Sequence, residues 1–262
     1  MAGTYRTNMI NKVIEKIILL VAAATFFVPL IFAPKNFIFP FIVPKIVVLR
    51  SLVLLLLGLY VLLLSIDWQR YRPRLTPTMI GVLAFWISFA ISTFAGVDWY
   101  RSFWDNHERM LGLFTVSHYI LLYIILASVM KSWDQWKWLL RAFLMAGGVV
   151  MVIAAIQRYY NPEFLLNRSG SRTASTLGNP IYVSGYGLFL VFLGYFLVWR
   201  ERHLFWRVFA VMGGALGFLG IFWGGTRGAF LGFLAGVCVL LLTYIIVHRH
   251  NRRVRIASIF IV

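Results

Sequence analysis

The chain has 262 residues, of which 61% are hydrophobic and 13% are charged, and its mean hydropathy is +0.83. This composition excludes an ordinary soluble domain, because too few polar side chains are present to cover its surface. The formal net charge of +17 does not indicate nucleic-acid binding, since the basic residues lie in short groups between apolar runs, as in the loops of a membrane protein.

Apolar runs separated by short polar breaks predict eight membrane-spanning helices, near residues 17–33, 46–66, 78–96, 113–130, 138–157, 179–199, 208–224 and 229–247. A helix needs about 20 apolar residues to cross the hydrocarbon core of a bilayer. The continuous Leu, Ile and Val runs do not alternate as the strands of a membrane barrel do. The sequence therefore predicts an all-α, polytopic helical bundle that forms a single transmembrane domain over residues 1–262.

Both ends of the chain carry a topological expectation. The first apolar run is followed by no small-residue cleavage site, so we interpret it as a retained span and not as a signal peptide. A ninth apolar run begins at Ile256 and stops at Val262, which is too short to cross a bilayer. We therefore expect the chain to be an amino-terminal fragment of a longer membrane protein.

The loops that alternate between the predicted spans differ in their content of Lys and Arg. The set that includes the amino-terminal segment holds 15 of these residues, and the opposite set holds 8. Loops rich in Lys and Arg remain in the cytoplasm. We therefore expect a cytoplasmic amino terminus and place the opposite loops on the outer side of the membrane.

Arg50 and His118 are expected inside predicted spans. Arg50 lies near the outer end of the second span, where its side chain either extends to the lipid headgroups or reaches an anion bound at the outer face. His118 in the fourth span is interpreted as a hydrogen-bonded packing residue in preference to a proton relay.

The first polar outer loop, residues 98–112, combines aromatic and charged side chains. Trp99, Tyr100 and Trp104 precede Asp105, His107, Glu108 and Arg109. Aromatic rings beside polar groups suit a sugar, whose faces are apolar and whose edges carry hydroxyl groups. Alternatively, the rings belong to the interfacial belt of the membrane and the charged side chains pair with one another.

The second and third polar outer loops, residues 158–180 and 224–228, each place an arginine before the start of a span. Arg172 precedes Asn179-Pro180, a favoured pair for the N-cap and first position of a helix, and Thr226 stands as a cap before Arg227. Helix amino termini attract anions, and guanidinium groups match phosphate oxygens. The pattern predicts a diphosphate clamp. The alternative interpretation is that these arginines only anchor loops among the headgroups.

Other patterns limit the chemistry. Gly213, Gly217, Gly220 and Gly224 recur along the seventh span and predict close helix packing. The single cysteine, Cys238, excludes a disulfide framework and a cysteine-rich metal site. The sequence has no phosphate-binding Gly-rich loop with lysine, no HExxH and no Asp-x-Asp pair. We therefore expect neither a cofactor nor a catalytic metal.

Three groups of residues on successive outer loops resemble the O-antigen ligase and polymerase family of bacterial membrane glycosyltransferases. They are Ser102-Phe103-Trp104 with Glu108-Arg109-Met110 and Gly112, then Arg172 with Gly178-Asn179-Pro180, and finally Thr226-Arg227-Gly228-Ala229. The resemblance covers most of the chain from about Asp98 to Val247. It departs from the usual family pattern at Asp105, often a glycine, and at Ile181, more often a second asparagine.

The resemblance implies a glycosyltransferase C-like fold in the bacterial inner membrane and a metal-independent enzyme. Such an enzyme transfers a glycan from an undecaprenyl-diphosphate carrier to a lipid A-core, polysaccharide or protein acceptor at the periplasmic face. Arg172 and Arg227 would hold the diphosphate, with Asn179 and Thr226 at the adjoining helix starts. Arg109, with Glu108, would border the donor site or brace its loop.

The resemblance also implies a general-base histidine in a large periplasmic loop beyond Val262, so the fragment alone is expected to be inactive. His107 is the substitute that this chain offers. The main alternative function is a transporter or flippase of a lipid-linked glycan, and a further one is a noncatalytic membrane scaffold. Transporters place charges near the bilayer midplane. Here the charges lie almost wholly in loops, which favours chemistry at the membrane surface.

Overall fold

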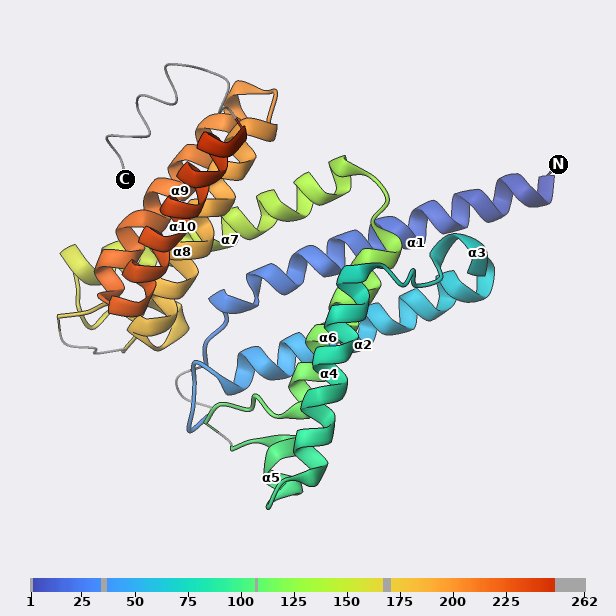
Figure 1. Ribbon diagram of the computed structural model, residues 1–262, viewed down its shortest axis with the longest axis horizontal. Coiled ribbons are helices and arrows are strands. Elements are labelled where there is room, and N and C mark those ends of the chain that lie inside the picture. Colours follow the sequence, from blue (N-terminus) through green and yellow to red (C-terminus); the bar gives the residue numbers. More distant parts are fainter. Residues whose placement is uncertain (1, 34–36, 107, 167–170, 248–262) are drawn as a thin grey trace.

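The computed structural model describes residues 2–33, 37–106, 108–166 and 171–247 (Figure 1). Every regular element in these ranges is helical. The α-helices are α1 (Ala2–Phe27), α2 (Val43–Ile66), α3 (Trp68–Tyr71), α4 (Pro77–Ala95), α5 (Trp99–Trp104), α6 (Leu113–Val129), α7 (Trp133–Tyr159), α8 (Pro180–Arg200), α9 (Leu204–Gly224) and α10 (Arg227–Val247). Short 3₁₀ turns follow at η1 (Val28–Leu30), η2 (Phe164–Leu166) and η3 (Ser175–Leu177).

Seven helices in the described ranges are long and apolar enough to cross a membrane: Met9–Leu30 of α1 with η1, then α2, α4, α7, α8, α9 and α10. The eighth predicted span corresponds to α6, an apolar helix of 17 residues. At a rise of 1.5 Å per residue it is about 25 Å long, slightly less than the hydrocarbon core. The prediction of a multi-pass helical membrane protein is thus confirmed. The expected ninth span lies outside the described residues.

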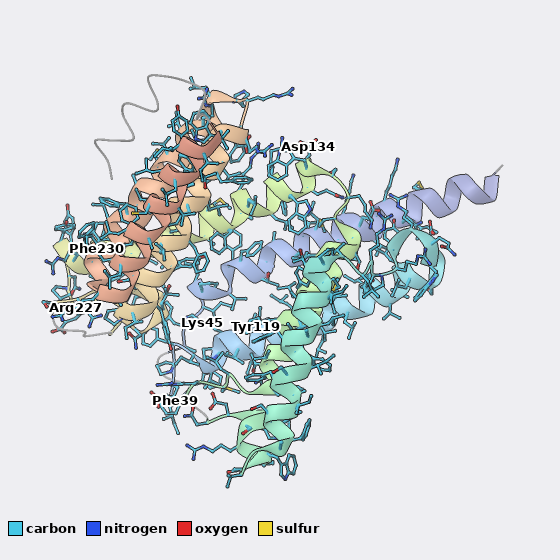
Figure 2. The ribbon with its side chains drawn as sticks, in the orientation of Figure 1. Phe39, Lys45, Tyr119, Asp134, Arg227 and Phe230 are labelled. Carbon is cyan, nitrogen blue, oxygen red and sulfur yellow. The ribbon has the colours of Figure 1, made fainter. Side chains whose placement is uncertain are left out.

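Alternate connections between the long helices lie on opposite sides of the bundle. α5 lies at the bottom of Figure 1, and Phe39 and Arg227 lie at the lower left and left of Figure 2, whereas α3 lies at the right of Figure 1 and Asp134 toward the top of Figure 2. This is the alternation that a chain crossing a membrane repeatedly requires. It places the loops predicted to face outward on one side of the molecule.

The buried side chains form two clusters that share α7. The first joins α1, α2, α6 and the beginning of α7, with Leu56 and Ile125 fully buried. The second joins the rest of α7 to α8 and α9, with Leu144 and Leu190 fully buried. Because α7 contributes to both clusters, it connects the amino-terminal and carboxy-terminal groups of helices.

The predicted packing role of the glycines is confirmed at the α8–α9 contact. A Cβ atom added to Gly217 would lie 2.7 Å from the carbonyl oxygen of Gly187, and one added to Gly194 would lie 2.6 Å from that of Ala210. Small residues allow helices to approach this closely in a membrane. α10 differs, since Ala229 is its one buried residue in the described part.

Candidate functional site

Residues 171–178 form the centre of the candidate site, because they connect the α9–α10 turn with the start of α2. Thr173 N–H donates to the carbonyl oxygen of Trp223 at 3.0 Å. Toward the other end, the ammonium group of Lys45 donates to the carbonyl oxygen of Thr176. The four residues from Thr173 to Thr176 are all buried. We refer to residues 171–178 as the bridging segment.

Buried hydrogen bonds to α7 hold the middle of the bridging segment. The amide oxygen of Gln157 accepts from Ser175 N–H at 2.6 Å, and the Ser175 hydroxyl donates to the carbonyl oxygen of Val150 at 2.6 Å. The amide nitrogen of Gln157 donates to Phe164 O at 2.8 Å. Ser175 has a φ of +50°, a conformation that is costly for serine and persists only when its surroundings fix it. These contacts fix the backbone of the bridging segment, and Arg172 lies three residues before Ser175 in that segment.

Arg172 binds the turn between α9 and α10. Its Nε donates to Gly224 O at 2.8 Å, and its Nη2 donates to the Thr226 hydroxyl at 3.2 Å. Gly225, between them, ends α9 in the left-handed conformation with a φ of +58°. A cation at the carboxy-terminal end of a helix is stabilised by the helix dipole. Arg172 thus fixes the geometry of this turn.

Arg227 is the first residue of α10 and its side chain is exposed. Thr226 occupies the N-cap position, since its carbonyl oxygen accepts from Phe230 N–H at 3.2 Å. Its hydroxyl group, which was predicted to cap α10, instead accepts from Arg172 and lies 3.5 Å from Gly224 O. With Phe222 and Phe230, Thr226 and Arg227 line an apolar pocket of about 470 Å³. The structure therefore joins Arg172 to Thr226 by a hydrogen bond, and Arg227 follows Thr226 at the amino terminus of α10, where Figure 2 labels it.

The helix start predicted at Asn179 and Pro180 is confirmed. Asn179 is the N-cap of α8 and its side-chain oxygen accepts from Ile181 N–H at 2.9 Å, while Pro180 occupies the first helical position. Gly178 has a φ of +77°, and a Cβ atom there would collide with Phe41. Glycine is thus required where the bridging segment passes α2 and enters α8.

Glu108 and Arg109 lie on the same side of the molecule and share a pocket with Asn179. This pocket has a volume of about 220 Å³ and is also lined by Phe41, Gly178 and Tyr182. Arg109 N–H donates to the side-chain oxygen of Asn106 at 2.8 Å, and the Arg109 side chain is exposed. The six predicted site residues therefore fall into two groups, and the bridging segment and its continuation at Asn179 contribute to both.

Arg50 braces the loop that carries Arg109. Its guanidinium group donates to Met110 O at 3.4 Å and to the Thr115 hydroxyl, and lies 4.8 Å from the centre of the Phe114 ring. Asp105 holds the same loop from the other side, because its carboxylate accepts from Leu111 N–H at 2.8 Å. Arg50 was expected to extend to the headgroups or to bind an anion. The structure instead shows it bonded to the loop that carries Arg109.

Lys45 is a further cation of the site, which the apolar pattern alone does not predict because Lys45 lies just before the second predicted span, at residues 46–66. It lies in the first turn of α2 and lines a cavity of about 390 Å³ together with Arg109, Tyr119 and Tyr182. Besides Thr176 O, its ammonium group donates to Phe41 O at 2.7 Å. The available signal was its place inside an apolar run, after Pro44 and before Ile46.

Histidines contribute little within the described ranges. His118 is buried and its Nδ1 lies 2.7 Å from Phe114 O, as expected of a hydrogen-bonded packing residue. His107 lies outside the described residues. Among the residues that the structure describes, no three His, Cys, Asp or Glu side chains come together to hold a metal ion.

The fold and this arrangement define a multi-pass helical membrane protein in which Lys45, Arg109, Arg172 and Arg227 lie on the side of the bundle that carries the polar loops 98–112 and 224–228. The chain matches no protein-family model, no curated protein and no solved structure.

Proposed function

We propose that this chain belongs to a glycosyltransferase of the O-antigen ligase type in the bacterial inner membrane. It transfers a glycan from an undecaprenyl-diphosphate carrier to a lipid, polysaccharide or protein acceptor at the periplasmic face. The observation that carries the proposal is the bond from Arg172 to Thr226, which holds a second arginine, Arg227, beside it at the start of α10.

The chemistry requires stabilisation of a leaving group. An acceptor hydroxyl oxygen attacks the anomeric carbon of the glycan while the bond from that carbon to the diphosphate oxygen breaks. The electron pair leaves with the diphosphate, and the hydroxyl proton passes to a general base. Negative charge therefore grows on the diphosphate, where preorganised cations and a helix amino terminus lower the barrier without moving.

The two arginines are suited to different parts of this task. Arg172 donates a hydrogen bond from Nε to Gly224 O. This bond fixes the turn between α9 and α10 and holds the guanidinium group beside Thr226. Arg227 is exposed at the amino terminus of α10 and is suited to direct contact with phosphate oxygens. The apolar pocket beside Arg227 suits the isoprenoid units next to the diphosphate.

The pocket lined by Glu108, Arg109 and Asn179 supports a role for the first outer loop in binding the glycan. Its lining combines a carboxylate, a guanidinium group and an amide with the ring of Tyr182. Such a mixture suits a sugar, because the edges of the ring carry hydroxyl groups and its faces are apolar.

The proposal is tested by replacing the two arginines in the bacterium that makes the protein. Arg172→Ala and Arg227→Ala are each expected to abolish glycan ligation, measured on a gel, while the protein still inserts into the membrane. Arg227→Lys is also expected to be strongly impaired, because an ammonium group cannot form the bidentate contact. Arg101→Ala removes an exposed cation from α5 on the same side and is the matched control.

The same strains distinguish a transferase from a transporter. Loss of a transferase leaves the lipid-linked glycan accumulating at the periplasmic face, whereas loss of a transporter leaves it in the cytoplasmic leaflet. Full ligation in both alanine variants would exclude the diphosphate clamp. Accumulation in the cytoplasmic leaflet would replace the transferase by a flippase.

A further inference from the structure

The cavity at Lys45 is a second feature of the same side of the molecule, separated from Arg227 by the bridging segment. The ends of that segment make different contacts: Thr176 bonds to Lys45, whereas Arg172 bonds to Gly224. We propose that this cavity binds an anionic lipid, with the phosphate at Lys45 and Arg109 and one hydrocarbon chain inside. The inference goes beyond the proposed function, because it holds whether the chain transfers or transports a glycan.

The charge of Lys45 indicates an anionic ligand. Its side chain is half-buried, and its two hydrogen-bond partners are carbonyl oxygens. The ion pairs in the described ranges are Glu15–Arg70, Asp134–Lys137 and Arg141–Glu201, so none of them neutralises Lys45. An ammonium group has three N–H donors, whereas Lys45 makes two hydrogen bonds among the described residues. Its further contact is with the Phe41 ring, whose centre lies 5.8 Å from Nζ and which carries no negative charge. A buried charge without a counterion is costly, and a phosphate would remove that cost.

A second cation faces the same space. Arg109 lines both the Lys45 cavity and the adjoining pocket with Glu108 and Asn179. The hydrogen bond known for Arg109 among the described residues uses its backbone N–H, so the guanidinium group is available. An ammonium and a guanidinium group that line one cavity suit a phosphate, which accepts charge-assisted hydrogen bonds from both.

The walls of the cavity indicate that the ligand is a lipid and not free phosphate. Beyond the two cations, the lining is mainly aliphatic and aromatic, with Leu49 one turn deeper than Lys45 along α2 and Leu122 on α6. Figure 2 shows Lys45 and Tyr119 on the facing helices α2 and α6. Apolar walls stabilise a hydrocarbon chain in proportion to the area they cover and offer nothing to an inorganic ion.

The depth of the cavity agrees with the dimensions of a lipid. Lys45 lies in the first turn of a membrane-spanning helix, at the level where headgroup phosphates are found. From there the lining passes to Leu49, Phe26 and Leu122, which belong to apolar parts of spans. The volume of about 390 Å³ lies within the range of ligand sites and accommodates part of one chain.

The test uses the full protein in phosphatidylcholine nanodiscs that contain phosphatidic acid with a nitroxide on one acyl chain. Electron paramagnetic resonance is expected to show a saturable, immobilised fraction that phosphatidylcholine or diacylglycerol with the same label does not show. Lys45→Gln and Arg109→Gln are each expected to weaken this binding by about tenfold or more, and Lys45→Arg to retain it. Leu49→Trp, which fills the cavity, is expected to abolish it.

Arg101→Gln is the matched control, because it removes an outer cation that does not line the cavity. Circular dichroism confirms that each variant is folded. Unchanged binding in Lys45→Gln or in Leu49→Trp would overturn the proposal. It would also be overturned if inorganic phosphate, followed by ³¹P nuclear magnetic resonance, bound at Lys45 while labelled phosphatidic acid did not. These measurements do not depend on glycan transfer, so failure of one proposal leaves the other standing.

Discussion

The ion pair between Arg141 and Glu201 gives a quantitative prediction about stability. The guanidinium group of Arg141 donates from Nε to Glu201 Oε1 at 2.7 Å and from Nη2 to Oε2 at 2.6 Å. The Glu201 side chain is 3% exposed and that of Arg141 is 21% exposed. The Arg141 guanidinium also lies 4.2 Å from the centre of the Trp206 ring. The pair therefore ties α7 to the α8–α9 connection.

Glu201→Gln removes the carboxylate and leaves Arg141 charged. Breaking a buried ion pair from one side costs about 3–5 kcal/mol, because the remaining charge is uncompensated. Since Arg141 keeps partial access to the surroundings, we expect a loss of roughly 2–4 kcal/mol in the free energy of unfolding. The measurement is a titration with sodium dodecyl sulfate in mixed micelles, followed by tryptophan fluorescence.

Two further variants complete this test. Asp134→Asn breaks an exposed pair with Lys137, in which the Asp134 side chain is 86% exposed, and is expected to leave the transition unchanged. Arg141→Gln combined with Glu201→Gln is expected to be less destabilising than Glu201→Gln alone, because no unpaired charge remains. If Glu201→Gln behaved like Asp134→Asn, or if the double variant were as unstable as the sum of the single ones, the reasoning would be refuted.

Three other predictions concern packing, capping and pH. Gly194→Leu is expected to destabilise the protein by about 1–3 kcal/mol, because even a Cβ atom would lie 2.6 Å from Ala210 O. Gly148→Ala is the control in the same detergent titration and is expected to leave stability unchanged, because no atom lies within 4 Å of the added Cβ. Asn179→Ala is expected to lower the free energy of unfolding by about 1 kcal/mol, because α8 loses its N-cap, and to lower glycan ligation as well. Equal stability of this variant and the parent would contradict the capping role of Asn179. Tyr71→Phe is expected to cost about 1.5–3 kcal/mol, because the buried Tyr71 hydroxyl donates to Glu15 Oε1 at 2.5 Å. Burial and Glu15 raise the pKa of Tyr71, so the stabilisation is complete below the ordinary tyrosine pKa of about 10 and declines as the pH rises above it. Unfolding titrations of parent and variant on both sides of that pH are therefore expected to converge at high pH, and a constant difference would contradict the assignment.

Local signals in the sequence were sufficient for the membrane-spanning segments and for the start of α8. The apolar runs predicted where the chain crosses the membrane, and Asn179 with Pro180 predicted the start of α8, because capping depends on residues next to one another. The start of α7 was predicted five residues late, near 138. Its capping box at Ser132 and Gln135 carries the helix beyond the apolar run.

Contacts between distant segments could not be predicted in the same way. Arg172 was expected to serve the helix that follows it in the chain, yet its Nε bonds to the carboxy-terminal end of α9. Lys45 joins the site because Thr176, far along the chain, reaches it. Arg50 likewise bonds to a loop that the chain forms much later. Each of these contacts depends on how the helices pack against one another. The spacing of apolar residues along the sequence does not determine that packing.

The contrast between the α8–α9 contact and α10 has a consequence for mutational tolerance. At Gly187, Gly194 and Gly217 the neighbouring backbone occupies the space of a side chain, so a saturation library should retain little besides glycine there. Along the rest of α10 after Arg227, by comparison, apolar residues of similar hydrophobicity should survive selection at most positions. The exceptions are Ala229, which is buried, and Gly236, where an added Cβ atom would collide with the Phe192 ring. Sequence divergence in this protein is therefore expected to accumulate on one helix while its neighbours stay almost fixed.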